Sequence, residues 1–202
     1  LLVPLLEEDE DNAGLNQCLA LAAQSTSEPD RRSELYYRLA IAREDLGLAW
    51  KDVLDPLKAS LDANPYRLAA ALRLADLTRE HSAHAQLADA LERVATASTD
   101  MAQKRHVLIE RAGLLAEHLD GPQAAEICLA EAIALDPEVI DTWVSLSSIQ
   151  SQRGDLAAAR DTLREILHEV EPASLDAAEL HRHLAKNASQ RGDLNEEAEY
   201  LR

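Results

Sequence analysis

The chain has 202 residues, with 20 Lys or Arg against 37 Asp or Glu, and a formal net charge of −17. This charge argues against nucleic acid and anionic membrane surfaces as partners, because both require a basic face on the protein. Hydrophobic residues make up 47% of the chain and aromatic residues 3%. We therefore expect an aliphatic core in which Ala and Leu, both strong helix formers, dominate.

Two further features of the sequence bear on the cellular compartment in which the protein is expected. No apolar run approaches the roughly 20 residues that a membrane-spanning helix needs, so membrane insertion is not expected. Cys18 and Cys128 both lie in apolar helical patterns, which indicates buried thiols rather than a disulfide framework. A reducing, cytoplasmic location is the expectation that follows.

The chain contains an internal repeat. Pro65 aligns with Pro137 and Leu91 with Leu163, and the hexamer SQRGDL occurs at Ser151–Leu156 and again at Ser189–Leu194. These offsets predict alternating units of about 34 and 38 residues, each made of two amphipathic helices. In chain order, the units are a partial unit at 1–28, helix pairs at 29–67, 68–105, 106–139 and 140–177, and a truncated last unit at 178–202.

The ends of the chain suggest a fragment of a longer array, since it begins with Leu and still shows a helical pattern at its end. The acidic run Glu7–Asp11 in the partial unit is interpreted as a solvated turn, with docking of a basic segment as the alternative. In the pair 29–67, Pro56 falls inside the second helix. It predicts either a kink or a late helix start with Asp55 as the cap.

The turns between paired helices carry helix-stop residues. Gly47, Gly121, Gly154 and Gly192 are each expected to adopt the left-handed conformation that ends a helix. The pair 68–105 has His81-Ser82-Ala83 where that glycine belongs.

The two Arg-Gly-Asp triplets therefore have a structural explanation. Asp155 and Asp193, each following a turn glycine, are predicted to cap the next helix. An adhesion motif would instead need a protruding loop in an extracellular protein, and we reject that interpretation.

The unit that starts at Ile140 resembles the tetratricopeptide repeat (TPR) most closely. Trp143 stands at the aromatic position of its first helix, Leu146-Ser147 at the large–small pair, Gly154-Asp155 at the turn and Ala159 at the small second-helix position. Gly113, Ala125 and Ser147 are expected to allow close approach of paired helices. The resemblance implies an all-α, TPR-like α-solenoid, a right-handed superhelix of antiparallel helix pairs, similar to arrays in large bacterial multi-repeat proteins.

The resemblance also implies a concave groove, lined by first helices, that binds a peptide or protein segment. The residues that the register places on this face are Arg38, Asp76, Arg79, Glu110, Glu117, Asp141, Ser148, Arg182 and Lys186. Arg182 and Lys186 are one turn apart and are expected to form a cationic patch for a carboxylate or phosphate. The Lys/Asn set of chaperone-tail binders is missing, so we predict no such binding.

Motifs for chemistry are absent from the sequence. It contains no phosphate-binding loop, no HExxH and no cysteine pair, so we predict no catalytic residue, no metal site, no cofactor and no enzymatic activity.

The leading hypothesis is accordingly an interaction scaffold that binds a protein or peptide, with a basic partner favoured by the acidic chain. The alternatives are a self-assembling structural array, and a regulatory or sensor arm of a larger enzyme or signalling protein.

Overall fold

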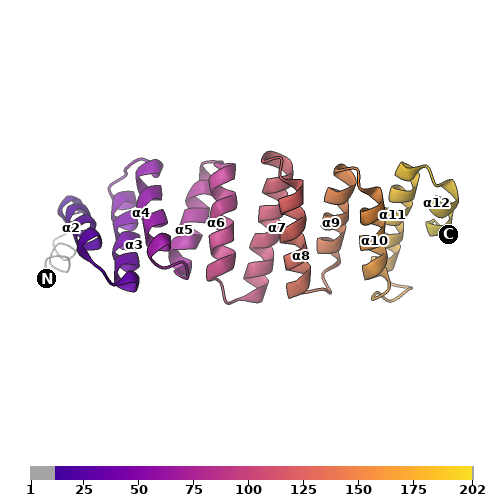
Figure 1. The fold of residues 1–202 in the computed structure, drawn as a ribbon, viewed down its shortest axis with the longest axis horizontal. Coiled ribbons are helices and arrows are strands. Elements are labelled where there is room, and N and C mark those ends of the chain that lie inside the picture. The colour runs from indigo at the N-terminus through magenta and orange to yellow at the C-terminus, as the bar shows by residue number, and fades with distance from the viewer. Residues whose placement is uncertain (1–11, 202) are drawn as a thin grey trace. The chain divides into compact units, whose positions relative to one another are not determined.

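A computed structural model of the chain describes residues 12–201, and within that range it contains α-helices and no strand. The acidic run Glu7–Asp11 and the start of the partial unit 1–28 lie outside the described residues. Within each of its two compact units, consecutive helices are antiparallel neighbours joined by short connections (Figure 1). The all-α prediction is confirmed.

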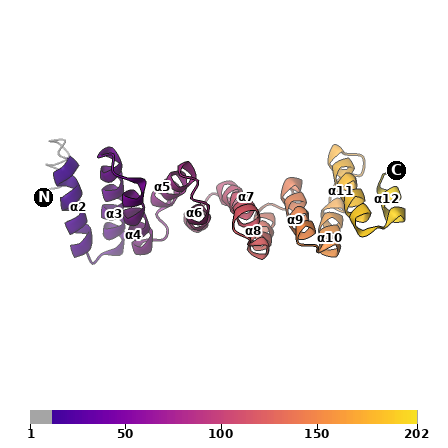
Figure 2. The same ribbon diagram turned by 90° about the horizontal axis from the view of Figure 1, so that it is seen from above.

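The chain divides into two compact units, the first ending at Asp100 and the second beginning at Met101. In the first unit each helix packs against the next one along the chain, and Figure 2 shows these neighbours from above. Its helices are α2 (Asn12–Ser25), α3 (Pro29–Asp45), α4 (Trp50–Ala63), α5 (Leu68–Glu80) and α6 (His84–Ala97).

The second unit repeats this arrangement, and in addition α9 contacts α11 across the intervening helix. Its helices are α7 (Met101–His118), α8 (Pro122–Leu135), α9 (Ile140–Gln152), α10 (Leu156–Leu167), α11 (Leu175–Arg191) and α12 (Leu194–Tyr200). The predicted divisions after residues 105 and 177 therefore fall inside α7 and α11. Both helices begin earlier than the repeat spacing indicated.

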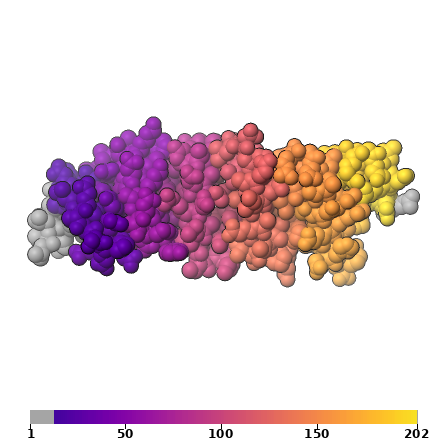
Figure 3. All heavy atoms as spheres, in the orientation of Figure 1, coloured from indigo at the N-terminus to yellow at the C-terminus, as the bar shows by residue number. Residues whose placement is uncertain are grey.

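The core of each unit runs between successive helices. In the first unit, Leu19 and Ala23 of α2 are fully buried against Leu39 of α3. In the second, Leu163 of α10 packs with Leu184 of α11. Atoms of consecutive helices within each unit are closely packed in the space-filling view (Figure 3). Because burial of apolar surface contributes about 25 cal/mol per Å², these helix–helix faces are what stabilise each unit.

The turn glycines match the prediction at three of four positions. Gly47, Gly154 and Gly192 have φ of 66°, 87° and 77°. The prediction for Gly121 is wrong, because its φ is −116°. There the left-handed residue is its neighbour Asp120, with φ of 50°.

The turn without glycine uses the same backbone geometry. Ser82, in the turn between α5 and α6, also has φ of 50°. The turn thus keeps its left-handed step although the residue carries a Cβ, at a cost of roughly 1–2 kcal/mol relative to glycine. The capping predictions are confirmed: Asp155 Oδ1 accepts a hydrogen bond from Ala158 N at 3.1 Å, and Asp193 Oδ1 accepts one from Glu196 N at 3.1 Å.

Pro56 lies inside α4, which begins six residues earlier at Trp50, so the predicted late helix start is wrong. A proline in this position cannot donate to the carbonyl four residues before it, that of Asp52. Arg43 of α3 supplies the missing donor, with its Nη1 2.6 Å from the Asp52 oxygen. Its Nε also donates to Asn16 Oδ1 of α2 at 3.3 Å, so one guanidinium connects three helices.

Gly113 does not have the role expected for it. A Cβ built at Gly113 would meet no atom within 4 Å, so this glycine is not required for close helix approach. Ala125 and Ser147, by contrast, are 0% and 5% exposed. Their small size is consistent with tight packing.

Substitution of Gly113 by Ala should stabilise the protein by about 0.5–1 kcal/mol, because alanine is the better helix former and has free space there. The same substitution at Gly154 should destabilise it by about 1–2 kcal/mol, because φ is positive. Urea denaturation of both variants measures whether the free energy of unfolding rises for Gly113→Ala and falls for Gly154→Ala. Destabilisation by Gly113→Ala would show that the glycine is needed for packing after all.

The hydrogen bond from Arg43 to the Asp52 carbonyl predicts that substitutions of Arg43 and Pro56 have coupled effects on stability. Arg43→Met should lower the free energy of unfolding by about 0.5–1.5 kcal/mol, since it removes the charged donor of the Asp52 carbonyl and leaves water to replace it. In a Pro56→Ala background the loss should be smaller, because the substituted alanine restores the helical N–H donor. A double-mutant cycle measures this difference. Arg31→Met, an exposed change in the same helix, is the control, and strictly additive effects would contradict the explanation.

Candidate functional site

The predicted groove residues of the first unit lie on two first helices. Arg38 is half-buried on α3, and Asp76 and Arg79 are exposed on α5. Arg79 Nη1 forms an ion pair with Asp76 Oδ1 at 2.8 Å. The two side chains are therefore paired with each other at the surface of α5.

The predicted residues of the second unit lie on three first helices. Glu110 and Glu117 are on α7, Asp141 and Ser148 on α9, and Arg182 and Lys186 on α11; all except the half-buried Glu110 are exposed. Ser148 and Lys186 of this set line a common pocket. Arg182 is not among the residues that line this pocket, and its Nε donates to the carbonyl of Ala178, 3.3 Å away in its own helix.

The pocket shared by Ser148 and Lys186 lies between α9 and α11, and its volume is about 280 Å³. It is lined by Val144, Ser147, Ser148, Ser151, Gln152, His183, Lys186, Asn187 and Gln190. Hydroxyl, amide, imidazole and ammonium groups thus face one space. We call it the α9–α11 pocket. Such groups can hydrogen-bond a polypeptide backbone and pair with a carboxylate.

Asn187, which lines this pocket, is held in place by two hydrogen bonds. It is 3% exposed, its Nδ2 donates to the Leu156 carbonyl of α10 at 2.9 Å, and its Oδ1 accepts from Arg191 Nε at 3.0 Å. A buried amide with both ends bonded fixes α11 against α10. The α9–α11 pocket therefore has a preformed wall.

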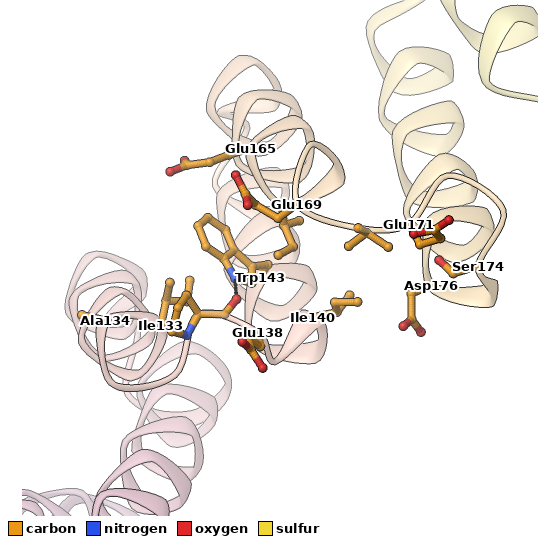
Figure 4. Close-up of a pocket in the computed structure, with 13 residues that line it drawn as sticks. Ile133, Ala134, Glu138, Ile140, Trp143, Glu165, Glu169, Glu171, Ser174 and Asp176 are labelled. Carbon is orange, nitrogen blue, oxygen red and sulfur yellow. Dashed lines mark hydrogen bonds between the residues drawn. The ribbon is translucent and has the colours of Figure 1, made fainter.

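A second, larger pocket was missed by the sequence analysis. It has a volume of about 810 Å³ and lies at the loop edge of the second unit, where Figure 4 shows its side chains. We call it the Trp143 pocket. Its apolar side chains are Ile133, Pro137, Ile140, Trp143, Ile166 and Val170, and its carboxylates are Glu138, Glu165, Glu169, Glu171 and Asp176, with Ala134 and Ser174 completing the lining.

The indole of Trp143 has a fixed orientation in this pocket. Its Nε1 donates to the carbonyl of Pro137 at 2.9 Å, which ties it to the connection between α8 and α9. The opposite wall comes from residues 168–174, the connection between α10 and α11. This connection is longer than residues 136–139, which join α8 to α9. A weak signal in the sequence was the density of glutamates around Pro172.

Two arginines outside the pockets are committed to structural contacts. The carboxylate of Glu44, which accepts a hydrogen bond from Arg73 Nε at 2.9 Å, raises the pKa of that guanidinium. In the second unit the hydrogen bond from Arg164 Nε to Tyr200 Oη, 2.8 Å long, raises the pKa of Arg164. Arg164 also pairs with Glu196 at 2.7 Å, so it connects α10 to α12.

Residues 12–201 show neither a membrane-spanning segment nor a metal-binding cluster. No helix there combines the length and the apolar composition that crossing a membrane requires. The same range contains no group of three or more His, Cys, Asp or Glu side chains placed to hold a metal ion.

The helix pairs and their turns define the class of fold: this is a TPR-like α-solenoid. Among solved structures, the chain resembles YrrB, described as a TPR protein with an unusual peptide-binding site, with a TM-score of 0.54 and 12% identity over 91% of this chain and 88% of that one. It resembles MamA with a TM-score of 0.54 and 16% identity over 84% of this chain and 87% of that one.

A higher TM-score, 0.67, is found with a chain in the structure of Naa15/Naa10 bound to HypK-THB, at 13% identity. That match covers 98% of this chain and 30% of the other. No family model and no curated protein sequence matches the chain. These similarities establish the TPR fold.

Proposed function

We propose that the chain is a non-enzymatic interaction scaffold, of cytoplasmic location, that binds a peptide or protein segment on its first-helix face. The observation that carries this proposal is the α9–α11 pocket, which Ser148, Lys186 and His183 line from two first helices. The fold similarity to YrrB, described as having a peptide-binding site, supports the same kind of ligand.

The chemistry of the pocket points to a particular kind of segment. Ser148 and Lys186 are exposed, whereas Ser147 and Asn187 behind them are buried. A ligand can therefore reach the hydroxyl and ammonium groups without displacing the core. We propose that Lys186 pairs with a carboxylate of the bound segment, while the serine hydroxyls and Gln190 hydrogen-bond its backbone.

Peptides selected from a displayed random library on the purified chain test this proposal. For peptides that bind, Lys186→Glu should weaken affinity at least about tenfold, or about 1.4 kcal/mol, because it replaces an attraction by a repulsion. Fluorescence anisotropy of a labelled peptide measures the change.

The control is Lys58→Glu, which makes the same charge change at an exposed position of α4 in the first unit. If both variants lose affinity equally, the effect is one of net charge and the α9–α11 pocket is not the site. The proposal would also be contradicted if neither Lys186→Glu nor Ser148→Arg changed the affinity of the selected peptides.

A further inference from the structure

We propose that the Trp143 pocket is a separate docking site for a basic protein segment in which an apolar residue lies between arginines. This site goes beyond the first-helix face, since its lining residues and those of the α9–α11 pocket do not overlap. It is formed instead by helix ends and two connections at the loop edge of the second unit.

The first observation is the hydrophobic floor. Ile133 and Ile166 are 8% and 4% exposed, and Ile140, Trp143 and Val170 are half-buried around them. These groups leave apolar surface facing a space of about 810 Å³. Because an apolar surface of this kind gains free energy when water is removed, an aliphatic or aromatic side chain is the group that fits the floor.

The second observation is the charge of the rim. Glu138, Glu165, Glu169, Glu171 and Asp176 surround the floor, and no Lys or Arg is among the residues that line the pocket. In the part of the chain that the structure describes, no ion pair joins any of these carboxylates to a cation. The nearby guanidinium of Arg164 is already engaged by Tyr200 and Glu196.

The arrangement of the rim sets the order of groups in the ligand. Glu165 and Glu169 project from α10 and the start of its connection, on the side of the Trp143 ring, whereas Glu171 and Asp176 lie on the side of α11 (Figure 4). Cations are therefore favoured on both sides of the apolar floor. A segment with basic residues flanking an apolar one satisfies both features at once.

Arginine suits this rim better than lysine. Its guanidinium can pair with a carboxylate through two hydrogen bonds and can also lie over the face of an indole. Its aliphatic stem can pack along the apolar floor while the charge stays at the edge. A second copy of the chain is a poor occupant, because the net charge of −17 makes the copies repel each other.

The test uses an array of short peptides with a central Leu, Ile, Phe or Gly and flanking Arg, Lys or Glu residues, probed with the whole chain. We expect binding to rank Arg above Lys, to require an apolar centre and to be absent with Glu flanks. Raising the salt from about 50 to 500 mM should weaken it, since the rim pairs are exposed. No binding by any Arg–apolar–Arg peptide would overturn the proposal.

Variants then locate the site. Glu169→Gln with Glu171→Gln should weaken the best peptide about five- to tenfold, because two exposed ion pairs are lost. Asp55→Asn with Asp89→Asn is the matched control: it makes the same change in net charge at exposed positions of the first unit that do not line the pocket. If both variants lose the same affinity for the peptide, the loss reflects the net charge of the chain, and the assignment of the peptide to the Trp143 pocket is overturned.

Two further readouts separate this site from the proposed function. The chain has two tryptophans, so the indole N–H signal of Trp143 can be assigned with a Trp50→Phe variant; the peptide should shift the Trp143 signal and leave that of Trp50 in place. Lys186→Glu should not weaken this peptide. If Lys186→Glu weakens binding of this peptide and Glu169→Gln with Glu171→Gln does not, the peptide occupies the α9–α11 pocket. The proposal of a second site at the Trp143 pocket then fails, while the proposed function stands.

Discussion

The structure of each unit depends on the burial of apolar stripes between helices that are neighbours within that unit. One amphipathic helix pair exposes too much of its stripe to be stable alone, and stacking removes that surface from water. Fully buried leucines such as Leu61, Leu91 and Leu163 recur in the second helices of the pairs. With hardly any aromatic residues, the core reaches its density through many close leucine–alanine contacts rather than a few large side chains.

The connections between helices are where the repeats differ, and these differences create the sites. The turns within the helix pairs are short and keep a left-handed backbone step, whether the residue is Gly154, Ser82 or Asp120. The connection from α10 to α11 is longer, and it contributes Glu169, Val170 and Glu171 to one pocket. A solenoid thus gains a distinctive surface where its repeat is least regular, because packing constrains the loops least.

The two pockets of the second unit have opposite chemistry. The α9–α11 pocket offers an ammonium, an imidazole, amides and hydroxyls, which suit a polar segment with a carboxylate. The Trp143 pocket offers carboxylates around an apolar floor, which suits a basic segment. A TPR-like scaffold with both surfaces can distinguish partners by charge, since a segment that fits one rim is repelled by the other.

The sequence by itself determined the all-α class, the helix pairs, the caps at Asp155 and Asp193 and most of the glycine turns. These features depend on neighbours within one or two helical turns, so periodicity and local side-chain chemistry report them directly. Only the tertiary structure decided that α4 runs through Pro56, because the donor that satisfies the Asp52 carbonyl comes from Arg43 on another helix. It likewise decided that Lys186 and Ser148 line one pocket while Arg182 hydrogen-bonds a carbonyl of its own helix. The Trp143 pocket could not be predicted from the sequence for the same reason. Its lining comes from residues 133–176, in four helices and two connections. These residues are brought together by helix packing, which spacing along the chain does not report.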